Sequence, residues 1–381
     1  MTVSTTTLPP TEGSDYENDH LQLSLHCSPF ERDPRPRVKV TFLAHGQNIG
    51  FSLMFDTGSI MTHIVLAEGL EVGAPDAPPS YLPQDGVDSS VEPVDRPAKW
   101  MEGYLDVGRV SKTAGAAKLM YGADDDRRRV DVTRRITEMA QLFSGETSFI
   151  HEIEINLTTK MEDRATGIGL LGAAPGSHFA RAAGVFAYMS AQADYKHAPS
   201  GGTLHIVGRE SDEQLRTFCR PGSDIAFFPL HGPADRIHWL VTGTMQSGVI
   251  RHEVTYLVDT GATGIFVTSD ILRAIKDALV EGGAVLEVAV PGYMLKYTNC
   301  FRYRSLPTID FTVGSGPSAV TVSLSPDDYI IRRPGPDGAC FLRLSDATAR
   351  AGRLLGVEIL SKLLTVFDQT RNRIGFCLIR S

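Results

Sequence analysis

The amino-acid sequence predicts an all-β protein, β-rich with a few short helices, built from two related lobes with a cleft between them. The first observation is an Asp-Thr-Gly triplet that occurs twice, at Asp56 and at Asp259, each time after an apolar run. The second is the abundance of turn residues, since 36 Gly and 22 Pro separate short runs rich in Val, Ile, Leu, Phe and Thr, a pattern typical of strands. The third is the length of 381 residues, which suits two lobes of roughly 150–200 residues each.

The N-terminal lobe is expected over residues 21–209. Residues 1–20 are rich in Thr, Pro, Glu and Asp and predict a disordered leader in which no signal peptide is visible. Residues 68–99 are rich in Pro, Asp and Ser and predict a long surface excursion. We expect a Gly/Leu turn over 167–172 and a short helix within 179–192. Strands are predicted by alternating residues and by apolar runs that end in turns, over 21–25, 37–44, 49–55, 118–122, 149–157 and 204–208.

The C-terminal lobe is expected over residues 223–381, after an inter-lobe linker at 210–222 that contains a Pro-Gly pair. Residues 269–281 have apolar residues at helical spacing after a Ser-Asp start and predict a helix. Residues 365–368 and 373–376 predict a terminal hairpin. Further strands are predicted over 225–230, 239–245, 253–258, 306–313, 320–324 and 328–331. Two similar β lobes indicate an internal duplication.

Composition narrows the class of function. A formal net charge of −8 argues against a nucleic-acid partner, and no apolar run reaches the roughly 18–20 residues that span a bilayer. The 11 histidines are scattered, without His-Glu-x-x-His or Cys-x-x-Cys spacing, so no metal site is expected. The 5 cysteines cannot all pair within the chain, which leaves open either one disulfide with free thiols or a disulfide framework.

The chemistry follows from two carboxylates that stand on Gly turns at the ends of buried strands. A buried charge is costly without a partner, so we expect Asp56 and Asp259 to meet across the cleft. Two carboxyl groups about 3 Å apart share one proton over a wide acidic range. The deprotonated group can take a proton from water while the other protonates or polarises a carbonyl oxygen. This combination suits direct attack of water on a peptide bond, with the catalytic water and no other cofactor.

Several other segments surround the two triplets in a fixed order. They are Tyr121-Gly122, the Gly-rich run 201–208, the run 306–311 with 324–330, and Leu354-Leu355-Gly356 followed by 366–368 and 373–376. Together with the triplets, they resemble the pepsin-type (A1) aspartic endopeptidases from about residue 21 to residue 379. The resemblance implies a bilobal pepsin-like fold and an aspartic endopeptidase that hydrolyses peptide bonds between hydrophobic residues.

The resemblance also implies roles for individual residues. Asp56 and Asp259 would form the catalytic dyad, with two threonines hydrogen-bonded beneath it and a serine bonded to the first carboxylate. The supporting residues would be Thr57, Gly58, Ser59, Thr260 and Gly261. Flap and substrate-binding residues would be Tyr121, Gly122, Met54, Leu257 and Thr263, with Tyr104 as the competitor for the flap tyrosine. The disulfide of the second lobe would join Cys300 to Cys340, and a pair of buried thiols is the alternative.

Three positions depart from the family pattern. His63 replaces a Trp that bonds to the flap tyrosine, and it could reach Tyr121 or lie at the surface. Ala262 replaces a hydroxyl residue, whose loss should raise the pKa of Asp259. Val357 replaces an Asp, and the loss of that negative charge should lower the pKa of Asp259. Renin-like members share both of the latter replacements, so we expect an activity optimum less acidic than that of pepsin.

Two classes of function are compatible with these residues. The first is an active endopeptidase with a polypeptide substrate, inhibited by pepstatin-type compounds and acting as a monomer. The second is a catalytically weak or inactive fold of the same type that binds peptides or proteins. Members without activity commonly lose a catalytic Asp, and the presence of both here favours the enzyme. The resemblance favours a secreted or vacuolar protein, although no signal peptide is visible.

Overall fold

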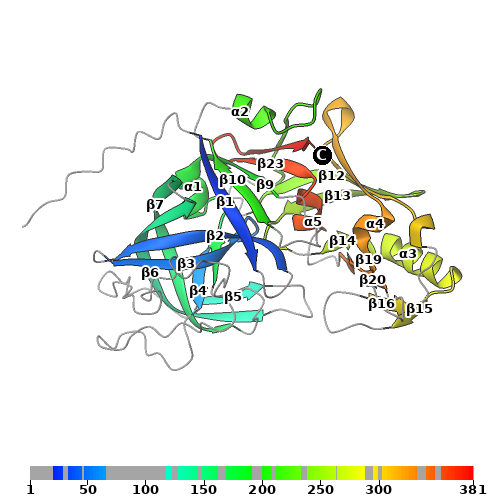
Figure 1. Cartoon of the computed structure of the whole chain (residues 1–381), viewed down its shortest axis with the longest axis horizontal. Helices are drawn as coiled ribbons and strands as arrows, with labels where there is room; N and C mark the ends of the chain where they lie inside the picture. The colour runs from blue at the N-terminus through cyan, green and yellow to red at the C-terminus, as the bar shows by residue number, and fades with distance from the viewer. Residues whose placement is uncertain are drawn as a thin grey trace, which may run out of the picture.

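The protein is mostly β-sheet, with short helices at the edges of the sheets (Figure 1). The computed structural model describes residues 20–28, 33–44, 47–65, 117–121, 128–144, 147–161, 169–190, 200–207, 212–232, 238–262, 264–287, 295–298, 303–332, 340–347 and 353–380. The predicted excursion over 68–99 and the leader before residue 20 lie outside these ranges.

The N-terminal half begins with long antiparallel strands and ends in shorter ones. Its strands are β1 (Leu21–Ser28), β2 (Asp33–Ala44), β3 (Gln47–Asp56), β4 (Thr62–Val65), β5 (Ala117–Tyr121), β6 (Arg128–Ser144), β7 (Thr147–Met161), β8 (Gly169–Gly172), β9 (Val185–Met189) and β10 (Ser200–Ile206). Its helix is α1 (His178–Ala183), and α2 (Asp212–Arg216) follows within the predicted linker. The helix expected within 179–192 is therefore shorter than predicted, because Gly184 ends it and β9 follows.

The C-terminal half repeats short strands around a single longer helix. Its strands are β11 (Ala226–Pro229), β12 (Leu240–Ser247), β13 (Ile250–Val258), β14 (Ile265–Val267), β15 (Val285–Glu287), β16 (Leu295–Thr298), β17 (Ile309–Val313), β18 (Val320–Leu324), β19 (Ile330–Arg332), β20 (Cys340–Leu342), β21 (Leu344–Asp346), β22 (Arg353–Leu355), β23 (Leu363–Asp368) and β24 (Arg373–Leu378). Its helices are α3 (Ser269–Glu281), α4 (Pro326–Tyr329) and α5 (Val357–Leu360), with 3-10 turns at Tyr303–Ser305 and Gly316–Ser318. The prediction of a helix over 269–281 is confirmed, as is the terminal hairpin formed by β23 and β24.

One sheet joins the two halves of the chain. Its 13 strands run in the order β11-β24-β23-β9-β10-β1-β2-β3-β8-β4-β7-β6-β5. The strand β23, near the end of the chain, thus pairs with β9, and in Figure 1 the red β23 lies beside the green β9. The remaining described strands form a sheet of 5 strands, one of 4 and one of 2. The division into lobes at 209 and 223 stays a prediction.

The internal duplication is visible in the strands that lead to the two triplets. The hairpin β2–β3 ends at the first triplet and the hairpin β12–β13 ends at the second. In both halves, the second strand of the hairpin then pairs in parallel with a later strand, β3 with β8 and β13 with β22. The Gly/Leu turn predicted over 167–172 is therefore wrong in its described part, because Gly169–Gly172 is strand β8. A strand rather than a turn is stable here because β8 is paired on both sides, with β3 and with β4.

A buried aromatic cluster holds the halves together behind the triplets. Phe186 of β9 stacks on Phe367 of β23, with ring centroids 4.8 Å apart. Trp239, which lies before β12, packs edge-on against both rings. Its indole nitrogen donates a hydrogen bond of 2.9 Å to the carbonyl oxygen of Ala173 in the other half. Closely packed protein interiors deform little under load. This aromatic cluster therefore restricts movement of one triplet relative to the other.

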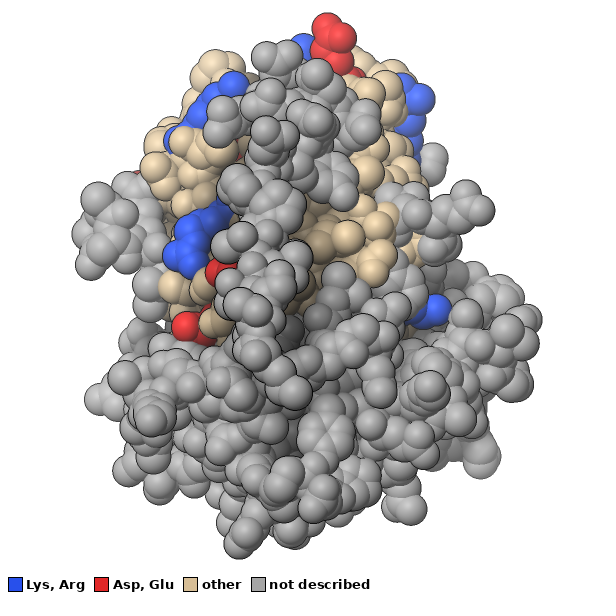
Figure 2. Space-filling view, turned by 90° about the vertical axis from the view of Figure 1, so that its left-hand side faces the viewer, with Lys and Arg blue, Asp and Glu red and all other residues tan. Residues whose placement is uncertain are grey.

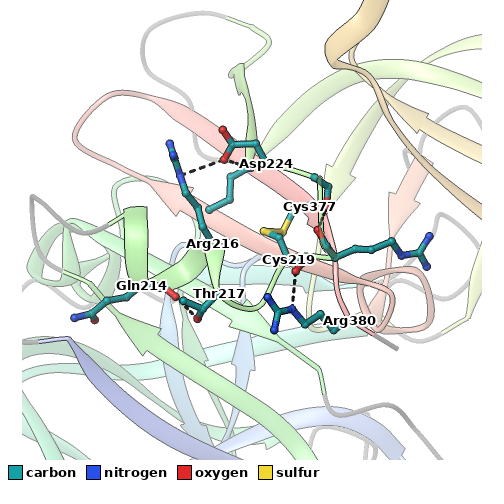
Figure 3. The surroundings of a disulfide bond; sticks show 10 residues. Gln214, Arg216, Thr217, Cys219, Asp224, Cys377 and Arg380 are labelled. Atoms are coloured by element: carbon teal, nitrogen blue, oxygen red, sulfur yellow. Dashed lines mark hydrogen bonds and ion pairs between the residues drawn. A yellow bond between two sulfur atoms is a disulfide. The ribbon is translucent and has the colours of Figure 1, made fainter.

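A disulfide between Cys219 and Cys377 fixes the segment after α2 to β24 (Figure 3). The side chain of Arg380 donates a hydrogen bond of 3.0 Å to the carbonyl oxygen of Cys219, and Arg216 forms an ion pair with Asp224 on the same segment. The state of these two cysteines was open at the level of sequence. Because β24 is a strand of the sheet that joins the halves, the bridge anchors the segment after α2 to that sheet.

Charge is dispersed over the part of the surface that the structure describes in Figure 2. The Lys, Arg, Asp and Glu side chains on that face form small separate groups among uncharged residues. Among the described residues, no helix has the length and apolarity required to cross a membrane.

Candidate active site

The two Asp-Thr-Gly turns meet tip to tip. Asp56 is the last residue of β3 and is buried, and Asp259 follows β13 and is partly buried. A Cβ atom added to Gly58 would lie 2.6 Å from the carboxyl carbon of Asp259. A Cβ atom added to Gly261 would lie 2.6 Å from the carboxyl carbon of Asp56. Each glycine therefore makes room for the carboxyl group of the opposite triplet, which no larger residue would allow.

Two threonines lock the turns together below the carboxyl groups. The backbone nitrogen of Thr57 donates to the hydroxyl of Thr260 at 3.0 Å, and the backbone nitrogen of Thr260 donates to the hydroxyl of Thr57 at 3.0 Å. The hydroxyl of Thr57 also donates to the carbonyl oxygen of Val258 at 3.1 Å. The hydroxyl of Thr260 donates to the carbonyl oxygen of Phe55 at 2.5 Å. Both threonines are fully buried, so every bond of this cross-lobe network is shielded from water.

Each carboxyl group is also held by its own turn. An oxygen of Asp56 accepts the backbone N–H of Gly58, and an oxygen of Asp259 accepts the backbone N–H of Gly261, both at 2.8 Å. The symmetry ends at the next residue. Ser59, which we expected to bond to the first carboxylate, instead donates its hydroxyl to the carbonyl oxygen of Met61 at 3.2 Å. The serine thus stabilises the turn backbone and is not a ligand of Asp56.

The two carboxyl groups behave as one titrating unit. Burial raises the pKa of Asp56 well above its usual value, and the negative charge of Asp259 and a hydrogen bond to it raise it further. Burial also raises the pKa of Asp259. The hydrogen bonds from Gly58 and Gly261 and the positive charge of Arg35 oppose these effects. A pair of this kind retains one shared proton at acidic to moderately acidic pH, which supplies a proton donor and a proton acceptor side by side.

His63 lies inside the N-terminal half and not at its surface. It belongs to β4, between β7 and β8, and is fully buried. Burial lowers the pKa of its imidazole to about 4. The ring is therefore neutral at physiological pH, and the surface alternative for this residue is wrong.

Other predicted site residues are placed only in part. Tyr121 ends β5 by its backbone, but its side chain lies outside the described structure, as do Tyr104, Gly122 and Thr263. Met54 is buried in β3 and Leu257 is half-buried in β13. Their roles, and that of the flap, stay predictions.

Cysteine chemistry is also only partly described. Cys340 is disulfide-bonded, whereas Cys300 lies outside the described residues, so the pairing of these two cysteines stays a prediction.

Three further features near the site are not indicated by the sequence patterns. They are the hydrogen bond from Trp239 to Ala173 and two basic residues, Arg35 and His238. Among the described residues, no group of three or more His, Cys, Asp or Glu is arranged to hold a metal ion.

Comparison with known proteins identifies the arrangement. The family model "Eukaryotic aspartyl protease" matches residues 239–379. Renin of Ovis aries is 32% identical over 128 residues, which cover 32% of this chain and 29% of that protein. Pepsin B of Canis lupus familiaris is 25% identical over 202 residues, which cover 50% of this chain and 45% of that protein. The crystal structure of the aspartic proteinase from Irpex lacteus superposes with a TM-score of 0.63 at 17% identity, over 95% of this chain and 98% of the other. The C-terminal half thus resembles the eukaryotic aspartyl proteases in sequence, and the fold of both halves is that of an aspartic proteinase.

The sequence matches and the structural match cover different shares of the proteins compared. The sequence match spans less than a third of the renin and less than half of the pepsin B, whereas the structural match to the fungal aspartic proteinase spans both halves. The fold of an aspartic proteinase thus extends over the N-terminal half, which lies outside the match to the family model. The bilobal fold predicted from the repeated triplets is confirmed.

Proposed function

We propose that this pepsin-like chain is an aspartic endopeptidase that hydrolyses peptide bonds between hydrophobic residues through water activated between Asp56 and Asp259. The observation that carries the proposal is the crossed packing of the two triplets, in which Gly58 faces one carboxyl group and Gly261 faces the other. Coupled carboxyl groups with raised pKa values are the chemical requirement for general acid and general base catalysis by one pair.

The reaction follows from a dyad that holds one proton. The ionised carboxylate takes a proton from water while the oxygen of that water forms a bond to the peptide carbonyl carbon. The protonated carboxyl group gives its proton to the carbonyl oxygen, which yields a neutral diol. The first carboxyl group then protonates the amide nitrogen, the C–N bond breaks, and a diol hydroxyl returns a proton to the second. The dyad ends with one proton, as it began, and no covalent intermediate forms.

The threonine network supports this chemistry by keeping the two carboxyl groups in place. Positioned acid and base groups gain their advantage only when the reacting atoms are held within a fraction of an ångström. Thr57 and Thr260 each anchor the opposite turn through two hydrogen bonds. The dyad of this proposal therefore requires both halves of the chain, because each half supplies one Asp-Thr-Gly triplet.

The experiment is hydrolysis of a quenched peptide library between pH 2 and pH 8, with and without pepstatin. Asp56→Asn and Asp259→Asn keep the shape of the side chain and remove its charge, and we expect each to lower kcat/KM at least about a thousandfold. Asp310→Asn, in β17, is the matched control and should leave the activity unchanged. A folded protein that binds pepstatin without cleaving any peptide would contradict the endopeptidase and favour a peptide-binding module.

A further inference from the structure

In each of the duplicated hairpins, a basic residue occupies the position that would lie opposite the aspartate if the strand register continued beyond the last paired residues. The pairs recorded for β2 and β3 run from Ala44 with Gln47 to Arg37 with Met54. Continuing this antiparallel register by two pairs brings Arg35, which still belongs to β2, opposite Asp56. Directly opposed residues of an antiparallel pair direct their side chains to the same face of the sheet. Arg35 is thus placed beside the first carboxyl group by the geometry of the hairpin.

The second hairpin repeats the arrangement. The pairs recorded for β12 and β13 run from Ser247 with Ile250 to Leu240 with Leu257. The next pair is in register too, because the backbone nitrogen of Val258 donates to the carbonyl oxygen of Trp239 at 3.0 Å. One further step brings His238 opposite Asp259.

The two basic residues therefore occupy equivalent positions in the duplication. The same number of positions, 21, separates Arg35 from Asp56 and His238 from Asp259. Equal spacing by itself has little weight, but it coincides here with equal register in two hairpins that are related by the duplication.

The charges of both residues act on the dyad. Arg35 lowers the pKa of Asp56 and of Asp259, and His238 lowers the pKa of Asp259. The charged groups with the largest effect on the first carboxyl group are Asp259 and Arg35. Those with the largest effect on the second are Asp56, His238 and Arg35. The positive charges of Arg35 and His238 thus oppose the effect of burial, which raises the pKa values of the two carboxyl groups.

His238 is suited to such a role by its surroundings. Its side chain is partly buried, and its Nδ1 atom is buried without a hydrogen-bond partner. Arg35 carries its charge at every pH at which proteins fold, whereas a histidine is charged only when its ring is protonated. The two halves therefore each contribute one basic side chain that acts on the dyad.

We propose that Arg35 and His238 are positioning residues, one from each half, that keep one carboxyl group of the dyad ionised inside a buried site. Their consequence for catalysis rests on the proposed endopeptidase function, while their effect on the dyad does not. Without them, burial would favour the doubly protonated dyad, which has no base to activate water. They extend the working range of the site toward acidic pH.

The first test is the pH profile of kcat/KM for Arg35→Gln. We expect the acid limb to move to higher pH, so that activity one pH unit below the wild-type midpoint falls about three- to ninefold. Arg35→Lys keeps the positive charge and should return the acid limb of the pH profile to its wild-type position. Arg251→Gln removes an exposed charge from β13 and should leave the profile unchanged. A limb that does not move in Arg35→Gln, or that moves equally in Arg251→Gln, overturns the role of Arg35.

The second test measures the titration of the two carboxyl groups and does not depend on enzymatic activity. Carbon-13 NMR of protein labelled at the Asp carboxyl carbon, assigned with Asp56→Asn and Asp259→Asn, follows the titration of the pair. We expect the titration to move upward in Arg35→Gln and in His238→Gln, but not in His231→Gln, whose side chain is exposed. An upward shift in a protein without peptidase activity would support the inference and reject the proposed function. Unchanged titrations in both variants overturn the inference even if the enzyme is active.

Discussion

Thr57 and Thr260 exchange backbone-to-hydroxyl hydrogen bonds across the two halves, each of 3.0 Å. The bonds are reciprocal, so neither hydroxyl can be removed without leaving a buried N–H of the other threonine unsatisfied. Thr57 additionally donates to the carbonyl oxygen of Val258. The stability of the fold and the geometry of the dyad are therefore supported by the same four side-chain bonds.

Replacement of Thr57 by valine removes the hydroxyl and keeps the shape of the side chain. The variant leaves the N–H of Thr260 and the carbonyl of Val258 without partners, and we expect the free energy of unfolding to fall by about 2–4 kcal/mol. Urea unfolding followed by fluorescence measures the change. Thr242→Val, at an exposed position of β12, serves as the control and should stay within about 0.5 kcal/mol. Equal effects of the two replacements would show that the reciprocal bonds add nothing to stability.

Replacement of Gly261 by alanine tests the crossed packing of the triplets. The new methyl group would lie 2.6 Å from the carboxyl carbon of Asp56, so the dyad must spread. We expect kcat/KM to fall at least about a hundredfold, because displacements near 1 Å have such effects. Activity assays with circular dichroism as a check on folding measure this loss.

A matched glycine provides the control for that replacement. Gly282 caps α3 with φ of −72°, and an added Cβ would lie 3.3 Å from helix carbonyl oxygens. Gly282→Ala should therefore change stability slightly and activity not at all. Full activity in Gly261→Ala would be incompatible with the close approach of the two turns.

Much of this site could be predicted from the sequence, because its chemistry is local. An Asp-Thr-Gly triplet after an apolar run identifies both carboxyl groups, and a Ser-Asp start with helical periodicity identifies α3 (Ser269–Glu281). The strand β8 (Gly169–Gly172) was misinterpreted as a turn, since its stability comes from pairing with β3 and β4. Partners distant in sequence are not visible in a local pattern.

The same reason explains the features that were missed. Whether Cys219 pairs with Cys377 depends on the sheet that brings β24 beside the linker, and the sequence alone allowed several pairings. The hydroxyl of Ser59 could have bonded to the carboxylate or to the backbone, and only the path of the turn decides between them. The equal spacing of the two basic residues from the aspartates was visible in the sequence but had no meaning without the strand register.

Three buried histidines should make the fold sensitive to acid. Burial lowers the pKa of His63, His151 and His205 from 6.5 to about 4. As pH falls, the unfolded chain takes up these protons first, so each histidine reduces stability between about pH 6.5 and pH 4, by up to about 3 kcal/mol. The raised pKa values of the two aspartates have the opposite effect on stability. The folded protein binds protons at these carboxyl groups more tightly than the unfolded chain does, so this contribution grows as the pH falls. Three histidines against one shared proton predict a net loss of folding stability as the pH falls from about 6.5 to 4.

His151 allows the effect to be isolated. Its ring lies 5.1 Å from that of Phe149 and 5.8 Å from that of Phe179, and neither ring nitrogen has a hydrogen-bond partner. His151→Phe should therefore fit and remove one titrating group. We expect the stability lost between pH 7 and pH 4, measured by urea unfolding, to be smaller in the variant by about 3 kcal/mol. His231→Gln, at an exposed position, should retain the wild-type dependence, and an unchanged slope in His151→Phe would refute the explanation.

The disulfide between Cys219 and Cys377 should stabilise the junction of the halves without acting on the dyad. It closes a loop between residues 158 positions apart, and the loss of such a bridge costs about 2–5 kcal/mol. We expect the double variant Cys219→Ala/Cys377→Ala to unfold at a lower temperature and to keep the wild-type kcat/KM well below that temperature. Dithiothreitol should destabilise the wild-type protein more than the double variant, in which any remaining effect reports the bond of Cys340. Loss of activity at temperatures where the variant is fully folded would instead indicate that this bridge helps to set the distance between the two aspartates.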